Sequence, residues 1–387
     1  MKRKLIIIFM FLLTILSVVV PIQMKTGNAF ALSIDGFDLT AKSALLMDYD
    51  TGKIVFEKNI NDRLPIASMT KIATLAVVFD AIEKGYLKEN DKTQISHHAA
   101  STGGSSAFLD EGASYEIGDL IKSVIIASAN DSAVALAEHL AGTEEHFVSK
   151  MNKLAENLNL TNTHFENCTG LPNEKHYSSA YDIAQIYKLI GLNPIYLRNS
   201  KVWTTCFLHP SGRRTDLVNT NRLVKSFDGI DGGKTGFTSA AKFCLTASAC
   251  RNGTRFIGVV IGVDDSKTRF AEMSKLLNFG FANYVSNQIV QKEIPVTITK
   301  FNRSKQMVNV YPEKNFSIFM EKTSEMKYTT DYDLKELKAP IKAGDVVGTL
   351  YIFDKNNIAV GEVNLIVNET VNQQTFKDGL LELINKW

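Results

Sequence analysis

The chain has 387 residues, 45% of them hydrophobic, and a formal net charge of +2. This length and composition allow a substantial core and predict about two domains. The balanced charge gives no indication of a nucleic-acid partner or of a strongly acidic one.

The N-terminal segment has the organisation of a secretory signal peptide. Basic residues at positions 2–4 precede an apolar run at 5–20, and residues 29–31 read A-F-A, which is a small-residue cleavage site. The run is shorter than the ~20 residues that span a membrane comfortably, which disfavours an uncleaved anchor. We predict that residues 1–31 are removed and that the mature chain acts outside the cytoplasm.

A hairpin and a helix follow. Residues 44–59 read as two strands joined by a D-T-G turn. A helix is predicted to begin at Ser68 and to end near Gly85, because apolar residues recur at the helical period between them. Residues three apart share one side of a helix, so the Ser68 hydroxyl would lie beside the amine of Lys71, a nucleophile next to a candidate base. The free N–H groups at the helix start favour negative charge developing there.

The pattern S-x-x-K is weak by itself, because it begins at Ser68, Ser239 and Ser324. In most proteins such a pattern is only a serine at a helix N-cap followed by an exposed lysine. Ser239 precedes a β-rich run and Ser324 lies in a polar stretch, so only Ser68 opens an apolar helix. The context therefore selects Ser68.

A joint between two helices is predicted next. One helix is predicted to begin around Asp119 as its N-cap, and Asp131 can cap a second helix that runs to Gly142. Ser128 and Asn130 then lie in the joint, where side chains can point out of the packing. The other predicted elements of this part are a helix at 144–157, a helix opened by Ser179, polar strands within 201–223, a hairpin of strands 243–250 and 255–263, and a helix at 269–284.

The composition changes near residue 290. Short alternating strands without a helix extend from there to about 371, which indicates a separate β domain. Residues 372–387 place apolar side chains on one helical stripe that ends in Trp387. Such a stripe fits either an amphipathic helix on a membrane surface or a last helix packed on the β domain.

The four cysteines are Cys168, Cys206, Cys244 and Cys250, too few for a disulfide framework in a chain of this size. Their spacings fit no usual metal site. Cys244 and Cys250 lie ~20 Å apart along one predicted strand, too far to bridge each other. We interpret most of them as small apolar core residues, with one bridge left open.

Three short motifs occur in order: S-x-x-K at Ser68, S-x-N at Ser128 and K-T-G at Lys234. A second K-T-G at 25–27 lies in the predicted signal segment. The G-K-T that includes Lys234 imitates the end of a phosphate-binding loop, but Asp228 stands where the leading glycine should be, and an exported protein meets no ATP. We reject the phosphate-loop interpretation.

The triplet, in this order and in these settings, resembles penicillin-binding proteins and serine β-lactamases. Longer segments are similar to the low-molecular-mass D-alanyl-D-alanine carboxypeptidases: G-G-S-S-A-F-L at Gly103, S-A-N-D-S-A at Ser128, C-T-G-L-P at Cys168, H-Y-S-S-A at His176, D-G-G-K-T-G-F-T at Asp231 and L-K-A-P-I-K-A-G-D-V-V-G-T-L at Leu337. The last match lies in the β domain, which β-lactamases lack.

The resemblance implies an α+β fold. Residues 32–287 would form a transpeptidase domain of the penicillin-binding-protein and β-lactamase type, with an antiparallel sheet flanked by helices and an all-helical lobe. Residues 288–371 would form a small β-sandwich-like domain, and 372–387 a terminal helix. The family often ends in a membrane anchor and Trp387 suits an interface, which favours the membrane interpretation.

The resemblance also implies catalytic roles. Ser68 would attack the carbonyl between two D-alanines while Lys71 takes its proton. Lys71 can do so near neutral pH only with a lowered pKa, and a second cation such as Lys234 could lower it. Ser128 and Asn130 would relay the proton to the leaving amine and hold the substrate amide. No metal or cofactor is implied.

The remaining implied roles concern substrate binding. Backbone N–H groups of Ser68 and Phe237 would form the oxyanion hole. Lys234, Thr235 and Gly236 of the K-T-G segment, with Arg269 as partner, would bind the terminal carboxylate of the substrate. An exposed helix-surface arginine is an equally good interpretation of Arg269 from the sequence.

The implied enzyme is a bacterial serine carboxypeptidase that trims the terminal D-alanine from peptidoglycan stem pentapeptides, at the outer face of the membrane or in the cell wall. Gly233 departs from the larger apolar residue that the family usually has before K-T-G, which would loosen this strand. No E-x-x-x-N element like that of class A β-lactamases lies between Ser128 and Lys234, so penicillin should trap Ser68 as a slowly released acyl-enzyme. A β-lactamase or esterase of the same fold, and a catalytically silent wall-binding protein, are the alternatives.

Overall fold

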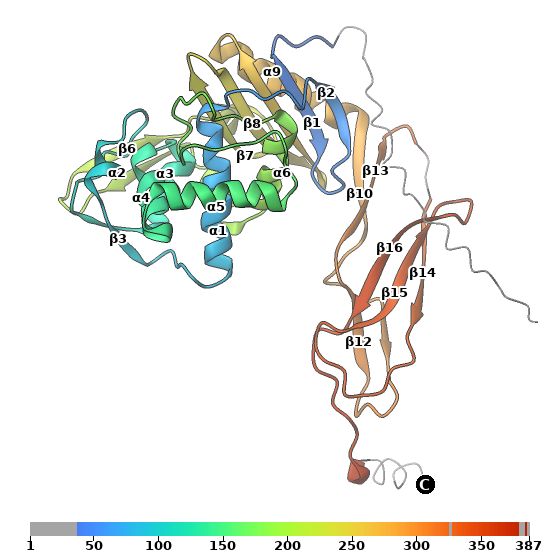
Figure 1. Cartoon of the computed structure of the whole chain (residues 1–387). Coiled ribbons are helices and arrows are strands. Elements are labelled where there is room, and N and C mark those ends of the chain that lie inside the picture. Colours follow the sequence, from blue (N-terminus) through green and yellow to red (C-terminus); the bar gives the residue numbers. More distant parts are fainter. Residues whose placement is uncertain (1–36, 325–326, 379–383, 385–387) are drawn as a thin grey trace, which may run out of the picture.

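The computed structural model describes residues 37–324, 327–378 and 384 (Figure 1). The predicted signal peptide, residues 1–31, lies outside this range, and so do residues 379–383 and 385–387 of the predicted terminal helix.

A five-stranded antiparallel sheet forms the centre of the N-terminal domain, in the order β2-β1-β9-β8-β7. Its strands are β1 Ser43–Asp48, β2 Ile54–Lys58, β7 Ile230–Thr238, β8 Lys242–Arg251 and β9 Thr254–Val263. Both predicted hairpins are confirmed, β1 with β2 and β8 with β9. The turn between β8 and β9 holds Asn252 and Gly253 at φ values of 51° and 80°, as a type I′ turn requires.

Helices cover both faces of this sheet (Figure 1). The lobe on one side contains α1 Lys71–Glu83, α3 Ile117–Ile126, α4 Asn130–Ala141, α5 Glu144–Asn157 and α6 Ala180–Ile190, and α9 Ser266–Asn283 lies on the other side. Alternate residues of a strand point to opposite faces, so Leu45 and Met47 are buried with the lobe and Leu46 is buried with α9. The predicted α+β architecture is confirmed.

The observed helix starts agree with some of the predicted N-cap residues and not with others. The predicted helix at 144–157 is confirmed, and Ser179 caps α6 by accepting the backbone N–H of Asp182. The N-cap predictions for Asp119 and Asp131 are wrong, because both residues lie inside the first turns of α3 and α4. The Asp131 carboxylate binds a neighbouring loop instead, as described below.

Short elements complete this domain. They are β3 Lys92–Gln94, α2 His97–Ser101, β4 Ser114–Glu116, α7 Pro194–Ser200, β5 Thr204–Leu208, β6 Arg214–Val218 and α8 Leu223–Ser226. The polar segment predicted to contain strands forms the β5–β6 hairpin. The helices α2, α7 and α8 are too short to give a periodic signal in the sequence.

The C-terminal part of the chain forms a β domain that extends away from the first domain (Figure 1). Its strands are β10 Tyr284–Val290, β11 Thr297–Thr299, β12 Val308–Pro312, β13 Phe316–Glu321, β14 Thr329–Leu334, β15 Val346–Phe353 and β16 Ala359–Ile366. Five of them form a sheet in the order β11-β12-β16-β15-β14, while β10 pairs with β13. The core of this domain includes Val310, Val347, Ile352 and Leu365. The predicted domain boundary at residue 288 lies within β10.

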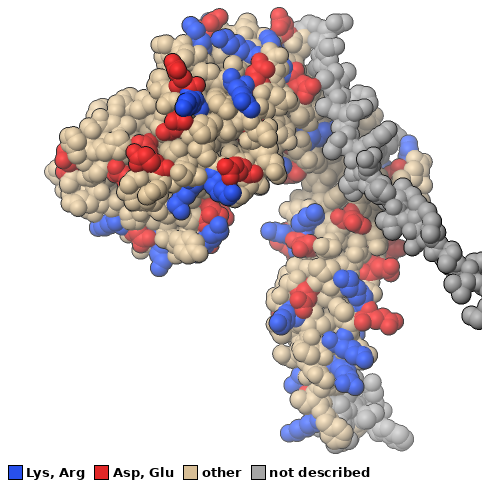
Figure 2. All heavy atoms as spheres, viewed as in Figure 1, with Lys and Arg blue, Asp and Glu red and all other residues tan. Residues whose placement is uncertain are grey.

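The face shown in Figure 2 mixes acidic and basic side chains over both domains, without a large area of one sign among the residues drawn in colour. All four cysteines are free thiols, Cys168 and Cys244 being buried as predicted for core residues. Within the described part of the chain, no helix is both long and apolar enough to cross a membrane.

Candidate active site

A tight turn carries the candidate nucleophile. The predicted α-helix does not begin at Ser68, because residues Ala67–Thr70 form a 3₁₀ turn, η1, and α1 starts at Lys71. Ala67 is buried and holds a positive φ of 48°, which is rare for a residue other than glycine. Ser68 follows this residue and is half-buried. The turn places the Ser68 Oγ 2.9 Å from the Nζ atom of Lys71, so the predicted pair is formed.

Lys71 is fully buried and has three polar partners. Its Nζ atom donates to Asn130 Oδ1 at 2.6 Å and to the carbonyl of Thr169 at 2.7 Å, and it lies beside Ser68. Burial lowers the pKa of Lys71 to about 7. The neutral amine keeps two N–H donors for Asn130 and Thr169 and one lone pair for the Ser68 proton. The lowered pKa was expected from a second cation, but burial is the main cause.

Ser128 and Asn130 lie in the predicted joint between α3 and α4. Ser128 has a positive φ of 64°, and its hydroxyl accepts a hydrogen bond from Lys234 Nζ at 2.7 Å. The Asn130 amide donates to the carbonyl of Gly103 at 2.6 Å while its oxygen accepts from Lys71. The joint therefore connects both lysines to the loop that contains Gly103.

The edge strand β7 supplies the other predicted residues. Lys234 is buried, and its pKa lies well below the ordinary value because of burial and of the charges of Lys71 and Arg269. The Thr235 hydroxyl donates to Thr220 Oγ1 at 2.7 Å. A Cβ atom on Gly236 would lie 2.6 Å from the carbonyl oxygen of Ile66, so glycine lets the strand pass directly against the nucleophile turn.

Arg269 is not an exposed helix-surface residue. Its guanidinium lies under β7, where it donates to the carbonyls of Gly236 at 3.4 Å and Cys244 at 3.3 Å. The rings of Phe243 and Phe270 lie 5.4 and 4.4 Å from it. Burial lowers its pKa to about 10. Phe237, which follows Gly236 in β7, has a side chain that is 56% exposed at the rim of the site.

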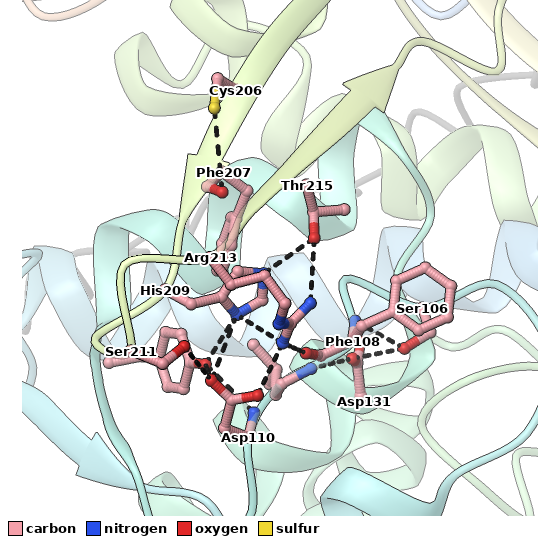
Figure 3. A network of polar contacts seen from close by, with 12 residues as sticks. Ser106, Phe108, Asp110, Asp131, Cys206, Phe207, His209, Ser211, Arg213 and Thr215 are labelled. Atoms are coloured by element: carbon pink, nitrogen blue, oxygen red, sulfur yellow. Dashed lines mark hydrogen bonds and ion pairs between the residues drawn. The ribbon is translucent and has the colours of Figure 1, made fainter.

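The Asp131 carboxylate holds the loop at residues 106–109 beside the site (Figure 3). This role was not predicted from the sequence. Its carboxylate accepts from the backbone N–H groups of Ala107 at 3.0 Å and Leu109 at 3.1 Å, and from the Ser106 hydroxyl at 2.6 Å. Because Asp131 directly follows Asn130, the loop and the catalytic joint are fixed together.

The opposite side of this loop is held by the β5–β6 hairpin (Figure 3). Arg213 donates to the carbonyl of Phe108 and, at 2.7 Å, to the carboxylate of Asp110. His209 is buried between Arg213 and Tyr115. The Nδ1 atom of His209 lies 2.8 Å from the hydroxyl of Tyr115. The hairpin and α4 therefore clamp the loop from two sides.

The C-T-G-L-P segment supports the nucleophile turn from below. Asn167 Oδ1 accepts the backbone N–H groups of Thr169 and Gly170, at 3.2 and 2.7 Å, and this turn presents the Thr169 carbonyl to Lys71. Gly170 has a φ of 83°, and a Cβ atom there would lie 2.0 Å from the carbonyl oxygen of Ala67. Apart from the side chains of Asn167 and Lys71, these contacts are made by main-chain atoms, and the sequence does not indicate which atoms those are.

Comparison with known proteins identifies the family. A family model described as D-alanyl-D-alanine carboxypeptidase matches residues 28–265, and one described as the C-terminal domain of penicillin-binding protein 5 matches residues 284–373. The chain belongs to the D-alanyl-D-alanine carboxypeptidase family. The predicted family and enzyme class are therefore confirmed.

Individual relatives of the carboxypeptidase cover most of both chains. D-alanyl-D-alanine carboxypeptidase DacF of Bacillus subtilis is 39% identical over 363 residues, 90% of each chain. DacC of Escherichia coli is 34% identical over 91% of this chain and 89% of its own. Among solved structures, penicillin-binding protein 5 of Haemophilus influenzae has a TM-score of 0.67 at 32% identity, covering 87% of this chain and 98% of its own.

In the carboxypeptidase, a neighbouring asparagine lies where a side chain at Gly233 would be. A Cβ atom on Gly233 would lie 2.6 Å from Nδ2 of Asn221, so the asparagine occupies the space of a larger side chain. The Gly233 N–H donates to the hydroxyl of Tyr196 at 3.0 Å, and the residue keeps its register opposite Ala247. The register of β7 shifts just before this residue, between Ile230 and Gly232.

Metal ligation has no candidate in the part of the carboxypeptidase that the structure describes, where no group of three or more His, Cys, Asp or Glu side chains could hold an ion. A groove of about 380 Å³ opens beside the nucleophile turn. Ala67, Gly170, Leu171, His176 and Thr238 are among its lining residues.

Proposed function

We propose that Ser68 is the nucleophile with which this D-alanyl-D-alanine carboxypeptidase removes the terminal D-alanine from peptidoglycan stem pentapeptides. The observation that carries this assignment is the contact between Ser68 Oγ and Lys71 Nζ at 2.9 Å, with Lys71 buried and its pKa lowered to about 7. A lysine in this state has a free lone pair at neutral pH and can accept the serine proton.

The reaction proceeds in two steps. Ser68 Oγ attacks the carbonyl carbon of the penultimate D-alanine as its proton moves to Lys71, and the backbone N–H groups of Ser68 and Phe237 bind the oxyanion. The C–N bond then breaks, the proton passes through Ser128 to the leaving amine, and D-alanine departs. Water hydrolyses the resulting ester, which returns the proton to Ser68.

The substrate carboxylate is bound at the edge of β7. Lys234 and Thr235 supply an ammonium group and a hydroxyl, and Arg269 contributes positive charge from beneath the strand. The pKa of Lys234 is well below its ordinary value in the free site. An incoming carboxylate favours the charged form of Lys234 and is expected to raise its pKa again.

The test compares Ser68→Ala with Ser239→Ala, which changes an exposed serine of the same S-x-x-K pattern in the turn after β7. Ser68→Ala should abolish both release of D-alanine from a D-Ala-D-Ala peptide and covalent labelling by a fluorescent penicillin, while Ser239→Ala retains both. Labelling that survives in Ser68→Ala would overturn the assignment. Fast penicillin hydrolysis by the wild type without release of D-alanine would indicate a β-lactamase instead.

The β-lactam adduct should be long-lived. No E-x-x-x-N element for deacylation follows Ser128, and β-lactams are therefore proposed to act as covalent inhibitors. Mass spectrometry of the adduct, mapped to the peptide that contains Ser68, measures its lifetime. Loss of the adduct as fast as D-alanine is released would contradict this expectation.

Two proposals concern location. Cleavage of the signal peptide after Ala31 would leave Leu32 as the first residue, which N-terminal sequencing of the protein from a bacterial host checks. The terminal segment 372–387 would lie on the membrane surface, so removing it should abolish co-sedimentation with lipid vesicles while D-alanine release continues. Equal sedimentation of the full and shortened chains would refute the anchor.

A further inference from the structure

A buried histidine contacts the nucleophile turn from beneath. His176 is 5% exposed, and its Nε2 atom lies 2.7 Å from the hydroxyl of Thr70, the last residue of η1. The same hydroxyl donates to the carbonyl of Ala67 at 2.8 Å. A chain of two hydrogen bonds therefore leads from His176 to the residue that precedes Ser68.

The partners of the ring fix its tautomer. The backbone N–H of Glu166 donates to Nδ1 of His176 at 3.2 Å, so Nδ1 is unprotonated and the proton of the neutral ring is on Nε2. The Nε2–H group must then donate to Thr70 Oγ1, which leaves the hydroxyl proton for the Ala67 carbonyl. Each of these atoms has one role, and burial lowers the pKa of His176 to about 4, which keeps the ring neutral.

The carbonyl of Ala67 belongs to the same planar peptide group as the backbone N–H of Ser68. No cis bond is present at this position, so the C=O and the N–H point in opposite directions. Fixing the carbonyl therefore fixes the direction of the N–H. Gly170 packs on the same peptide, because a Cβ atom there would lie 2.0 Å from Ala67 O and 2.9 Å from Ser68 N.

We propose that His176 is a positioning residue that acts through the Thr70 hydroxyl to aim the Ser68 N–H at the oxyanion. The inference rests on the proposed function, in which that N–H is one of two oxyanion donors. Positive φ at Ala67 is unfavourable for a residue with a side chain, so this peptide needs external contacts to hold its orientation. The two hydrogen bonds and the packing of Gly170 supply them.

The experiment measures acylation by a chromogenic cephalosporin, separating the first-order rate constant at saturation from the dissociation constant of the non-covalent complex. Thr70→Val keeps the shape of the side chain and removes the hydroxyl, and Thr70→Ser keeps the hydroxyl. His176→Leu removes the ring donor, and His176→Gln retains a donor and an acceptor. Ser304→Ala is the control, because it also removes a buried hydroxyl that donates to a carbonyl, that of Gln306, but lies in the β domain.

Thr70→Val and His176→Leu are expected to lower the acylation rate constant about 10- to 100-fold, since a misdirected oxyanion donor is lost only in the transition state. The dissociation constant should change by less than about 3-fold, and Thr70→Ser and His176→Gln should restore most of the rate. The Thr70→Val/His176→Leu double variant should be no slower than Thr70→Val, because both changes break one chain of contacts.

Wild-type acylation rates in Thr70→Val, or an equal loss in Ser304→Ala, would overturn the inference. A loss confined to the dissociation constant would do the same. If His176→Leu does not fold, the Thr70→Val and Thr70→Ser pair decides the question. Absence of acylation in the wild type would refute the proposed function itself, which distinguishes that failure from a failure of this inference.

Discussion

The pH dependence of acylation tests whether burial alone makes Lys71 a base. With a pKa of about 7, the neutral fraction of Lys71 rises from roughly 9% at pH 6 to roughly 91% at pH 8. The acylation rate should therefore increase about 10-fold over this interval and then level off. A lysine with its ordinary pKa of about 10.5 would give a rise of about 100-fold over the same interval, without a plateau below pH 10.

A neutral aryl ester is the suitable acylating reagent, because it lacks the carboxylate that Lys234 is proposed to bind. Stopped-flow release of the phenol between pH 5.5 and 9 gives the profile, and Ser68→Ala supplies the blank. His176, with a pKa of about 4, and Arg269, with a pKa of about 10, titrate outside this window.

Lys234→Gln then separates the two causes. Because burial is the main reason for the lowered pKa of Lys71, the midpoint in this variant should remain within about one unit of 7. A midpoint that moves close to 10.5 would show that the second cation is the main cause. A rate that rises tenfold per pH unit throughout the window, in the wild type, would refute Lys71 as a buried base.

Two further substitutions test the supports of the site. Gly170→Ala places a Cβ atom 2.0 Å from Ala67 O, so it should lower the free energy of unfolding by more than about 2 kcal/mol and prevent penicillin labelling. Gly142→Ala is the control, because Gly142 has a similar φ of 80° but no atom within 4 Å of the added Cβ. This variant should lose only about 1 kcal/mol. Urea denaturation measures both, and equal losses would contradict the steric argument. Asp131→Asn weakens the hold on the loop at 106–109 and should slow labelling several-fold while increasing proteolysis in that loop. Asp119→Asn, in the first turn of α3, is its control, and labelling by Asp131→Asn at the control's rate would dismiss the role of the carboxylate.

Elements with local signals could be predicted from the sequence. The turn at Asn252-Gly253 and the cap at Ser179 are each determined by one or two residues, and the structure has both. The three motifs were brought together as expected, since Lys71 contacts Asn130 and Lys234 contacts Ser128. Their order along the chain and the longer family matches were sufficient for this.

Features that depend on tertiary contacts could not be predicted. Asp131 has the sequence signature of an N-cap, but its carboxylate is used by a loop more than 20 positions away in the chain. The sequence suggests a neighbouring charge as the cause of the lowered pKa of Lys71, because burial of an amine among helices has no local signal. Thr169 and Gly170 support the site through their main-chain atoms. Every residue has such atoms, so the sequence does not indicate which of them make contacts.

The burial of Lys71 also weakens the fold that contains it. A pKa lowered from 10.5 to about 7 means that the protonated amine disfavours the native state by about 5 kcal/mol, a large fraction of the 5–15 kcal/mol that stabilises a typical domain. Below pH 7 this penalty is complete, and it decreases as the pH rises from 7 towards 10.5, because the unfolded chain then binds the extra proton. The buried amine of Lys71 is thus required for catalysis but lowers the stability of the fold. Lys71→Met, which replaces it with an uncharged side chain of similar size, should yield a more heat-resistant but inactive protein.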